Sequence, residues 1–319
     1  MRIVFMGTPE FAVPSLAALL TSEHRVVGVV TQPDRPKGRG QELAASPIKQ
    51  LAVQHKIPIL QPLKMKDPAF LDALSAWKPD LIAVTAFGRI LPKVILDLPP
   101  RGCVNVHASL LPKYRGAGPI QWALIRGERE TGITTMLMDE GMDTGAMLLQ
   151  ERIAITPDDT AGTLSSKLAD IGGRLLLDTL ERIQNGTVTP QPQDPSQATM
   201  APLLKKEDGL LDWTLPALEL VNRVRGLSPW PGAYTYLGED RWVVWKASVL
   251  DRSSVATVLP GTILDATKEG MTVATGDGVL RIMEFQPANS RRMSVAQYLT
   301  GHTLAPGLRL GPPPPTAAV

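Results

Sequence analysis

The sequence predicts an α/β protein in which a mostly parallel sheet domain is followed by a small, OB-like β-barrel domain. In the first half of the chain, short apolar runs alternate with amphipathic segments of helix length, which is typical of β-α units that are covered on both faces. In the second half, five short strand-like runs are separated by turn residues, which is typical of a small barrel.

The elements of the first domain follow from periodicity. Strands are expected at residues 3–6, 26–31, 58–60, 81–85, 102–106, 133–137 and 146–149, and helices at 11–20, 47–55 and 69–77. Between residues 160 and 183, apolar side chains recur at helical spacing and predict a long amphipathic helix that closes the domain. In a parallel sheet with helices on both faces, ligands bind beyond the carboxyl ends of the strands.

The domain boundary is expected in a stretch that is rich in Pro, Gln and Ser and has no periodicity. We therefore predict a catalytic-type domain at 1–188, a linker at 189–205, the barrel at 206–311 and a disordered tail at 312–319. Within the barrel domain, a helix is expected at 216–225 and strands at 234–237, 242–249, 261–265, 271–275 and 279–283.

The composition indicates a globular protein. Of the 319 residues, 44% are hydrophobic and 20% charged, and the net charge is +2, which excludes global disorder and a strongly basic nucleic-acid coat. The single cysteine, Cys103, excludes an intramolecular disulfide and is interpreted as a small buried hydrophobe. No run approaches the ~20 apolar residues of a spanning helix, so we expect a cytoplasmic protein. No long apolar surface pattern requires a dimer, so a monomer is expected.

The first turn, at residues 7–11, occupies the place of a dinucleotide phosphate loop. It holds one glycine where the G-x-G-x-x-G fingerprint needs three, so a dinucleotide site is rejected. The free N–H groups of the helix that follows leave weak anion binding as an alternative to a plain strand-to-helix turn.

The densest group of chemically capable residues spans 105–119. Strand alternation puts Asn105 and His107 on one side of a strand where it ends in a Gly/Pro-rich loop. An amide can donate to an oxyanion and an imidazole can move a proton, which are the two requirements of acyl transfer to an amine. The alternative is a histidine satisfied by local hydrogen bonds.

A carboxylate at the tip of a second turn, residues 138–145, points to the same chemistry. Asp143 lies between two glycines there and can reach His107, fix its tautomer and favour its protonated form. The alternative is an aspartate that only shapes its own turn.

Together these segments resemble a known family. Residues 105–112, 114–117 and 139–145 are similar to the signature of formyltransferases that use 10-formyltetrahydrofolate. The opening at 3–12, the segment at 32–40 and the second domain narrow the resemblance to methionyl-tRNA formyltransferases, over nearly the whole chain. The resemblance implies a Rossmann-like catalytic domain and an OB-like second domain, in agreement with the fold predicted above.

By position, the resemblance implies that Asn105, His107 and Asp143 are the catalytic residues. It places the folate against two segments, whose candidate residues are Phe87, Gly88, Ile90, Leu91, Ser109, Leu110, Leu111 and Pro112. Apolar Phe87, Ile90 and Leu111 suit a pterin ring, although each is also a natural core anchor. No metal is expected, because the four histidines are too scattered to form a ligand set.

A basic loop at residues 35–40 is the clearest candidate for contact with nucleic acid. Arg35, Lys37 and Arg39 lie there with no acidic residue between them, and the resemblance assigns them to the acceptor end of tRNA. The alternative is a solvated surface loop. From residue 189 onward, 12 basic residues balance 12 acidic ones, so the second domain lacks the basic excess expected of a tRNA-binding barrel.

The sequence therefore predicts an enzyme that formylates methionine on initiator tRNA, with 10-formyltetrahydrofolate as donor. The first alternative is a folate-dependent formyltransferase or hydrolase with a small substrate, which would need neither the second domain nor the basic loop. The second is a non-catalytic tRNA-binding or nucleotide-sensing module, which would not need Asn105, His107 and Asp143 together.

Overall fold

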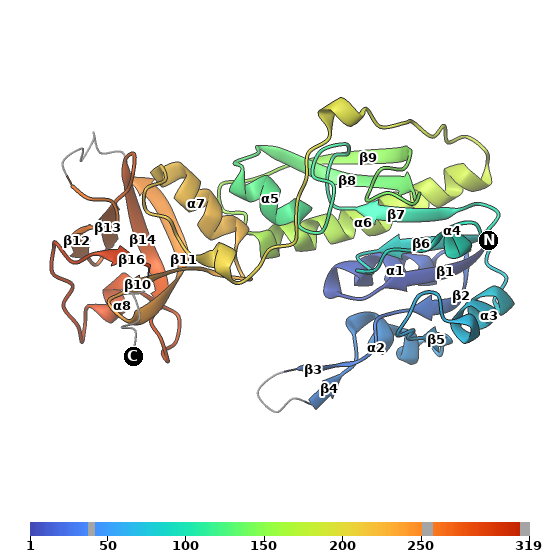
Figure 1. Ribbon diagram of the computed structural model, residues 1–319, viewed down its shortest axis with the longest axis horizontal. Coiled ribbons are helices and arrows are strands. Elements are labelled where there is room, and N and C mark those ends of the chain that lie inside the picture. Colours follow the sequence, from blue (N-terminus) through green and yellow to red (C-terminus); the bar gives the residue numbers. More distant parts are fainter. Residues whose placement is uncertain (38–41, 251–257, 313–319) are drawn as a thin grey trace. The chain divides into compact units, whose positions relative to one another are not determined.

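The computed structural model describes residues 1–37, 42–250 and 258–312, and the chain divides into two compact units (Figure 1). The first unit contains residues 1–119, 130–154 and 165–202, and the second contains 120–129, 155–164 and the chain from 203 onward. The domain boundaries predicted from the sequence stay a prediction. Of the predicted tail, residues 313–319 lie outside the described residues.

The first unit is built on a seven-stranded sheet in the order β5-β2-β1-β6-β7-β8-β9. Neighbours from β5 to β7 pair in parallel, and β8 and β9 are added antiparallel at one edge. The strands are β1 (Arg2–Gly7), β2 (Arg25–Val30), β5 (Ile59–Leu60), β6 (Leu81–Thr85), β7 (Cys103–His107), β8 (Glu130–Leu137) and β9 (Met147–Ala154). The predicted α/β class with a mostly parallel sheet is confirmed.

Helices lie between these strands along the chain or follow the last of them. They are α1 (Val13–Thr21), α2 (Pro47–Gln54), α3 (Pro68–Ala76), α4 (Lys93–Leu96), α5 (Pro119–Ile125) and α6 (Ala161–Gln184), with short 3₁₀ turns η1 (Glu10–Ala12) and η2 (Pro195–Gln197). Side-chain caps set two of the starts: Ser46 accepts from the Lys49 N–H before α2, and Asp67 accepts from the Ala69 N–H before α3. Among the described residues, no helix combines the length and apolar character needed to cross a membrane.

Two adjacent glycines let α6 approach the sheet and α1 closely. A Cβ at Gly172 would lie 2.9 Å from Val106 Cγ1, and one at Gly173 would lie 2.8 Å from the Pro14 carbonyl oxygen. Any larger residue would push the helix away, because neither the strand nor the helix backbone can yield cheaply. This contact holds the strand that carries Asn105 and His107.

Cys103 lies in the apolar cluster under the other face of the sheet. Its neighbours in that cluster include Val4, Ile82 and Ile95, all fully buried. Burial raises the pKa of the Cys103 thiol to about 12, because a thiolate would lose its hydration there. The interpretation of this residue as a small hydrophobe agrees with its place.

We expect the folded chain to resist thiol alkylation. At pH 8 almost no thiolate forms when the pKa is about 12, so iodoacetamide should leave Cys103 unmodified in the native chain and modify it readily in concentrated guanidinium chloride. Mass spectrometry of both samples checks this. Rapid modification of the native chain would contradict the burial of this thiol.

The second unit is an antiparallel sheet that curls into an OB-like barrel. Its order is β12-β13-β14-β11-β10-β16, and β15 pairs with β14. The elements are η3 (Glu207–Gly209), α7 (Ala217–Gly226), β10 (Ala233–Leu237), β11 (Asp240–Leu250), β12 (Ile263–Thr267), β13 (Gly270–Ala274), β14 (Val279–Gln286), β15 (Met293–Ser294), α8 (Val295–Tyr298) and β16 (Leu310–Gly311). The chain near residue 310 pairs with β10 and also bonds to Gly261 and Ile263, which joins the two ends of the sheet.

The barrel interior is aromatic and aliphatic. Trp213 and Trp242 are buried, and the Trp213 indole N–H donates to Thr235 Oγ1 at 3.0 Å. Trp242 stacks on Phe285 with ring centroids 4.7 Å apart. These two tryptophans therefore stabilise the barrel core, and their buried rings are not exposed for stacking on the bases of a nucleic acid.

The structure contains several short elements that the sequence did not predict, namely α4, α5, α8, β15 and β16. Of these, α5 buries Ile120, Ala123 and Leu124. The segment expected as a basic loop contains a small antiparallel hairpin, β3 (Arg35–Lys37) with β4 (Glu42–Ala44), because its flanking residues pair in register. Arg39, at the centre of that segment, lies outside the described residues.

Candidate active site

The carboxyl ends of β6 and β7 carry most of the residues singled out from the sequence. Residues 86–91 follow β6, and residues 108–118 follow β7. Because β6 and β7 are parallel neighbours, the two segments emerge at the same edge of the sheet. This edge is the candidate active site.

Asn105 and His107 occupy alternate positions of β7 and so share one face of the sheet. Asn105 lies between Val84 of β6 and Met136 of β8, and it is half-buried. His107 pairs with Thr134 and is 5% exposed. The structure thus brings the predicted amide and imidazole to the same side, at the end of a buried strand.

Both ring nitrogens of His107 face oxygen atoms. Nε2 lies 2.9 Å from the Tyr114 carbonyl oxygen, and because a carbonyl only accepts, this contact needs a hydrogen on Nε2. Nδ1 lies 3.6 Å from Oδ2 of Asp143, which is ion-pair range but slightly long for a direct hydrogen bond. The side chains are 6% and 16% exposed, so water screens this interaction weakly.

The Asp143 carboxylate does not close its own turn. Its Oδ2 accepts from the Gly116 N–H at 2.8 Å, and its backbone is in the left-handed region at φ 53°. Asp139 makes the turn bonds instead, accepting from the Gly141 N–H at 3.0 Å and the Thr144 hydroxyl at 2.7 Å. Of the two interpretations of Asp143, these contacts fit the one in which its carboxylate faces His107, rather than the one in which it only shapes its own turn.

Gly145 allows this turn to close. A Cβ at Gly145 would lie 1.8 Å from the Leu137 carbonyl oxygen, so no other residue fits where the turn returns to β9. The position of Asp143 near His107 therefore depends on a close backbone contact between Gly145, two residues after it, and Leu137, six residues before it.

Gln193 is a site residue that the sequence did not reveal. Its amide nitrogen donates to the carbonyl oxygens of Asp143 and Gly145, both at 2.8 Å. Its Oε1 accepts from Nε and Nη2 of Arg115 at 3.0 and 2.7 Å. Gln193 and Arg115, both 9% exposed, thus fasten the Asp143 turn to the loop after β7. Gln193 belongs to the segment predicted as a linker, where nothing in the local pattern marks it.

Residues 199–201 of the predicted linker also bond to the loop after β7. The Tyr114 N–H donates to Thr199 Oγ1 at 2.9 Å, and Arg115 exchanges backbone bonds with Thr199 and Ala201. Residues 199–201 therefore support the carbonyl group that meets His107.

The candidate folate residues divide into buried and open groups. Phe87, Leu91, Ser109 and Leu111 are at most 3% exposed, whereas Ile90 is 77% exposed. The apolar side chains of Phe87 and Leu111 were expected to face a pterin, but the structure packs them into the interior, where their burial stabilises the fold. Gly88 is exposed, and Leu110 and Pro112 are half-buried. Only Ile90 among the three expected apolar contacts is open to a ligand through its side chain.

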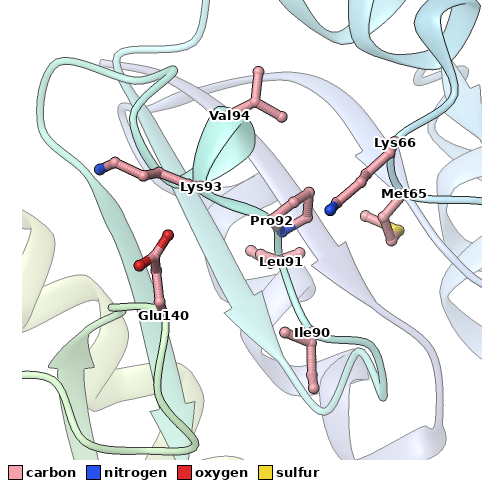
Figure 2. A pocket seen from close by; sticks show the side chains of 8 residues that line it. All are labelled: Met65, Lys66, Ile90, Leu91, Pro92, Lys93, Val94 and Glu140. Atoms are coloured by element: carbon pink, nitrogen blue, oxygen red, sulfur yellow. The ribbon is translucent and has the colours of Figure 1, made fainter.

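An open pocket of about 600 Å³ lies beside Ile90 (Figure 2). It is lined by Met65, Lys66, Ile90, Leu91, Pro92, Lys93, Val94 and Glu140. The Asp97 carboxylate, which bonds the Lys93 ammonium, raises the pKa of Lys93 above its ordinary value, with a smaller contribution from Glu140. The pocket thus combines apolar walls with ammonium groups and one carboxylate.

The candidate tRNA residues that can be described lie on the β3–β4 hairpin. Arg35 is exposed, and its Nη2 donates to Gln32 Oε1 at 2.6 Å. Lys37 is the last residue of β3. Across the ranges that the structure covers, no three His, Cys, Asp or Glu side chains gather as a metal site would require.

Comparison with known proteins gives the family. Residues 1–180 match the family described as "Formyl transferase", and residues 203–303 match "Formyl transferase, C-terminal domain". The chain is 51% identical over 316 residues to the methionyl-tRNA formyltransferase of Trichlorobacter lovleyi, covering 99% of both chains. This chain belongs to the methionyl-tRNA formyltransferase family.

Further relatives of this family fit the same assignment. The methionyl-tRNA formyltransferase of Desulfotalea psychrophila is 52% identical over 301 residues, covering 94% of this chain and 93% of its own. Among solved structures, an N-formyltransferase of Helicobacter canadensis, in complex with folinic acid and dTDP-3-aminofucose, has a TM-score of 0.65 at 18% identity and covers 88% of this chain and 98% of its own. That likeness concerns the fold alone.

Proposed function

We propose that this chain transfers the formyl group of 10-formyltetrahydrofolate to the α-amino group of methionine on initiator tRNA. The observation that carries the proposal is the meeting of His107 and Asp143, on the face of β7 that also bears Asn105. The family assignment supplies the reaction class, and the sheet edge supplies groups that suit it. Translation initiation is a cytoplasmic process, so we propose this location, and we propose a monomer.

Asn105, His107 and Asp143 have complementary roles in this proposal. A neutral amine attacks the formyl carbon, a C–N bond forms, and the carbonyl oxygen becomes an oxyanion. The Asn105 amide and the His107 ring can donate to that oxyanion. A proton must then pass from the amine to the folate nitrogen as the old C–N bond breaks, and His107 can move it while Asp143 compensates the ring's charge.

One bond must open before His107 can act on a substrate atom. In the structure Nε2 bonds the Tyr114 carbonyl and Nδ1 faces Asp143, so both nitrogens already have protein partners. We propose that substrate binding displaces the loop after β7 enough to release Nε2. The Asp143 contact then keeps the ring oriented.

The pocket beside Ile90 supports a folate as the donor. A folate carries a flat aromatic body and a glutamate with carboxylates, and the pocket offers Ile90, Leu91 and Met65 as apolar walls with Lys66 at its side. Buried Phe87 and Leu111 contribute through their backbones in this proposal.

We expect Arg39→Ala to weaken the contact with tRNA. Loss of a guanidinium that binds phosphate or a base edge should cost ~1 to 3 kcal/mol of binding and reduce its salt dependence. The KM for charged tRNA should rise while the folate Kd stays constant. Arg25→Ala is the control. Arg25 is exposed and is the first residue of β2, so it lies at the amino end of that strand, away from the carboxyl-end edge that holds the candidate site. Altered folate affinity with unchanged tRNA kinetics would remove this loop from tRNA binding.

Single-turnover transfer of labelled formyl tests the whole proposal. The enzyme with labelled 10-formyltetrahydrofolate is mixed with methionyl initiator tRNA, with methionine methyl ester, or with buffer alone. Transfer to the charged tRNA at a rate far above the other two supports the proposal. Transfer to the small amine, or release of formate at the same rate, supports the alternative of a small-substrate formyltransferase or hydrolase.

A further inference from the structure

Gln32 lies between two parts of the first unit that the proposed function gives to different substrates. One is the basic hairpin, β3 and β4, which holds Arg35. The other is the folate-candidate loop, residues 86–91. Gln32 is half-buried, directly before the hairpin in the chain, and its side-chain amide contacts both parts.

The amide nitrogen of Gln32 holds the folate-candidate loop. Nε2 donates to the Phe87 carbonyl oxygen at 2.9 Å and lies 3.4 Å from the Gly88 carbonyl oxygen. The contact is close, because a Cβ on Gly88 would lie 2.7 Å from this nitrogen. Gly88 also has a φ of 74°, so the loop conformation and the approach of Gln32 both depend on this glycine.

Thr8 completes a small ring of bonds at this point. The Gln32 N–H donates to Thr8 Oγ1 at 3.4 Å, and the Thr8 hydroxyl donates to the Phe87 carbonyl oxygen at 3.2 Å. The Phe87 carbonyl therefore accepts from two side chains. Gln32 is the one of the two that also contacts the hairpin.

The amide oxygen of Gln32 faces the hairpin. Oε1 accepts from Nη2 of Arg35 at 2.6 Å, and this leaves the other guanidinium N–H groups of an exposed side chain for a phosphate. Hydrogen bonds fix Asp34, the residue just before β3. Its carboxylate accepts from the Lys49 ammonium at 2.6 Å and from the Gln61 amide at 2.8 Å. These bonds lower the pKa of Asp34, so its carboxylate keeps its charge at neutral pH.

We infer that Gln32 is a positioning residue that couples tRNA binding at the hairpin to folate binding at the loop. A phosphate that orders Arg35 also orders the Gln32 amide, and an ordered Nε2 holds residues 87 and 88 in place. The loop then needs less ordering when folate binds, so each substrate tightens the binding of the other. The inference rests on the proposed function and names a device that links its two sites.

The test measures the affinity for one ligand with and without the other. The folate probe is folinic acid and the tRNA probe is uncharged initiator tRNA, so no transfer occurs. In the wild-type chain, saturating tRNA should lower the Kd for folinic acid by roughly 5-fold or more, and saturating folinic acid should lower the Kd for tRNA by the same factor. In Gln32→Leu the factor should fall to about 1.

Gln150→Leu is the matched control. Its amide nitrogen also donates to the backbone of a folate-candidate segment, at 2.8 Å to the Leu111 carbonyl oxygen, and its other partners are Thr134 and Met147, which lie outside the hairpin. This variant can weaken folinic acid binding, but the coupling factor should stay at its wild-type value. Gln32→Glu serves if Gln32→Leu does not fold, because it still accepts from Arg35 and cannot donate to the Phe87 and Gly88 carbonyls.

The outcomes separate the inference from the function on which it rests. A factor of 1 in the wild-type chain, or an unchanged factor in Gln32→Leu and Gln32→Glu, overturns the inference while the enzyme still formylates tRNA. Loss of the coupling factor in Gln150→Leu as well as in Gln32→Leu also overturns the inference, because any change at the folate site would then abolish the coupling. Absence of any tRNA binding to the wild-type chain overturns the proposed function itself.

Discussion

Replacing His107 with alanine is expected to lower the rate of formyl transfer by at least about 10²-fold, the usual contribution of one general acid–base group. His107 is the only imidazole among the candidate site residues, and it lies at the end of β7 beside a carboxylate. The measurement is the single-turnover rate with folate and charged tRNA both saturating, so weaker binding does not lower the result. Turnover close to wild type would remove His107 from the mechanism.

Asn105 should show a loss of similar size for a different reason. Asn105→Ala removes the amide donor, and Asn105→Asp keeps the shape while replacing the N–H₂ group with an acceptor. Both variants should slow the transfer step, and the aspartate should not rescue it. An aspartate variant with wild-type turnover would show that only the volume of this side chain matters.

Folding must be checked separately for His107→Ala. The histidine is 5% exposed and bonds the Tyr114 carbonyl, so its loss leaves a buried acceptor without that partner and costs about 1 to 3 kcal/mol. Thermal unfolding measures this cost. His55→Ala is the matched control, because His55 is exposed at the end of α2 and should change neither stability nor turnover.

The sequence was sufficient for the parallel part of the sheet, and it directed attention to a candidate site at one edge of that sheet. Strands β1, β6 and β7 are short apolar runs with helical segments between them, and this alternation alone predicts parallel neighbours with a site at their carboxyl ends. The strand order, in contrast, could not be predicted in this way, because nothing in β7 itself indicates that its next neighbour, β8, runs antiparallel. That pairing depends on contacts across the whole domain.

The site details that were missed depend on contacts between segments far apart in the chain. Gln193 reaches Asp143 across fifty residues from a stretch without periodicity, so its role follows only from the folded backbone. The exposure of apolar loop residues has the same origin. Phe87, Ile90 and Leu111 look alike in sequence, and packing alone decides that Ile90 is open while the other two are buried.

Asp143→Asn is expected to lower turnover by about 10²-fold or more while the folate Kd changes little. The asparagine keeps the size of the side chain, and its oxygen can still accept from the Gly116 N–H, so the turn should keep its form. Asparagine also tolerates the left-handed φ of 53° at this position. What is lost is the negative charge 3.6 Å from Nδ1 of His107, and with it the stabilisation of a ring that carries a proton during transfer.

Asp139→Asn is the control that separates this role from turn formation. Asp139 lies in the same turn, but it is exposed, and its bonds to Gly141 and Thr144 stay within the turn. A loss of turn structure should therefore lower the melting temperature of Asp139→Asn, whose side chain makes the turn bonds, more than that of Asp143→Asn. The charge effect should appear only in Asp143→Asn, as lower turnover with both substrates saturating. If Asp143→Asn lost folate affinity and kept its turnover at saturation, Asp143 would be a wall of the folate site, and His107 would need another group to compensate its charge.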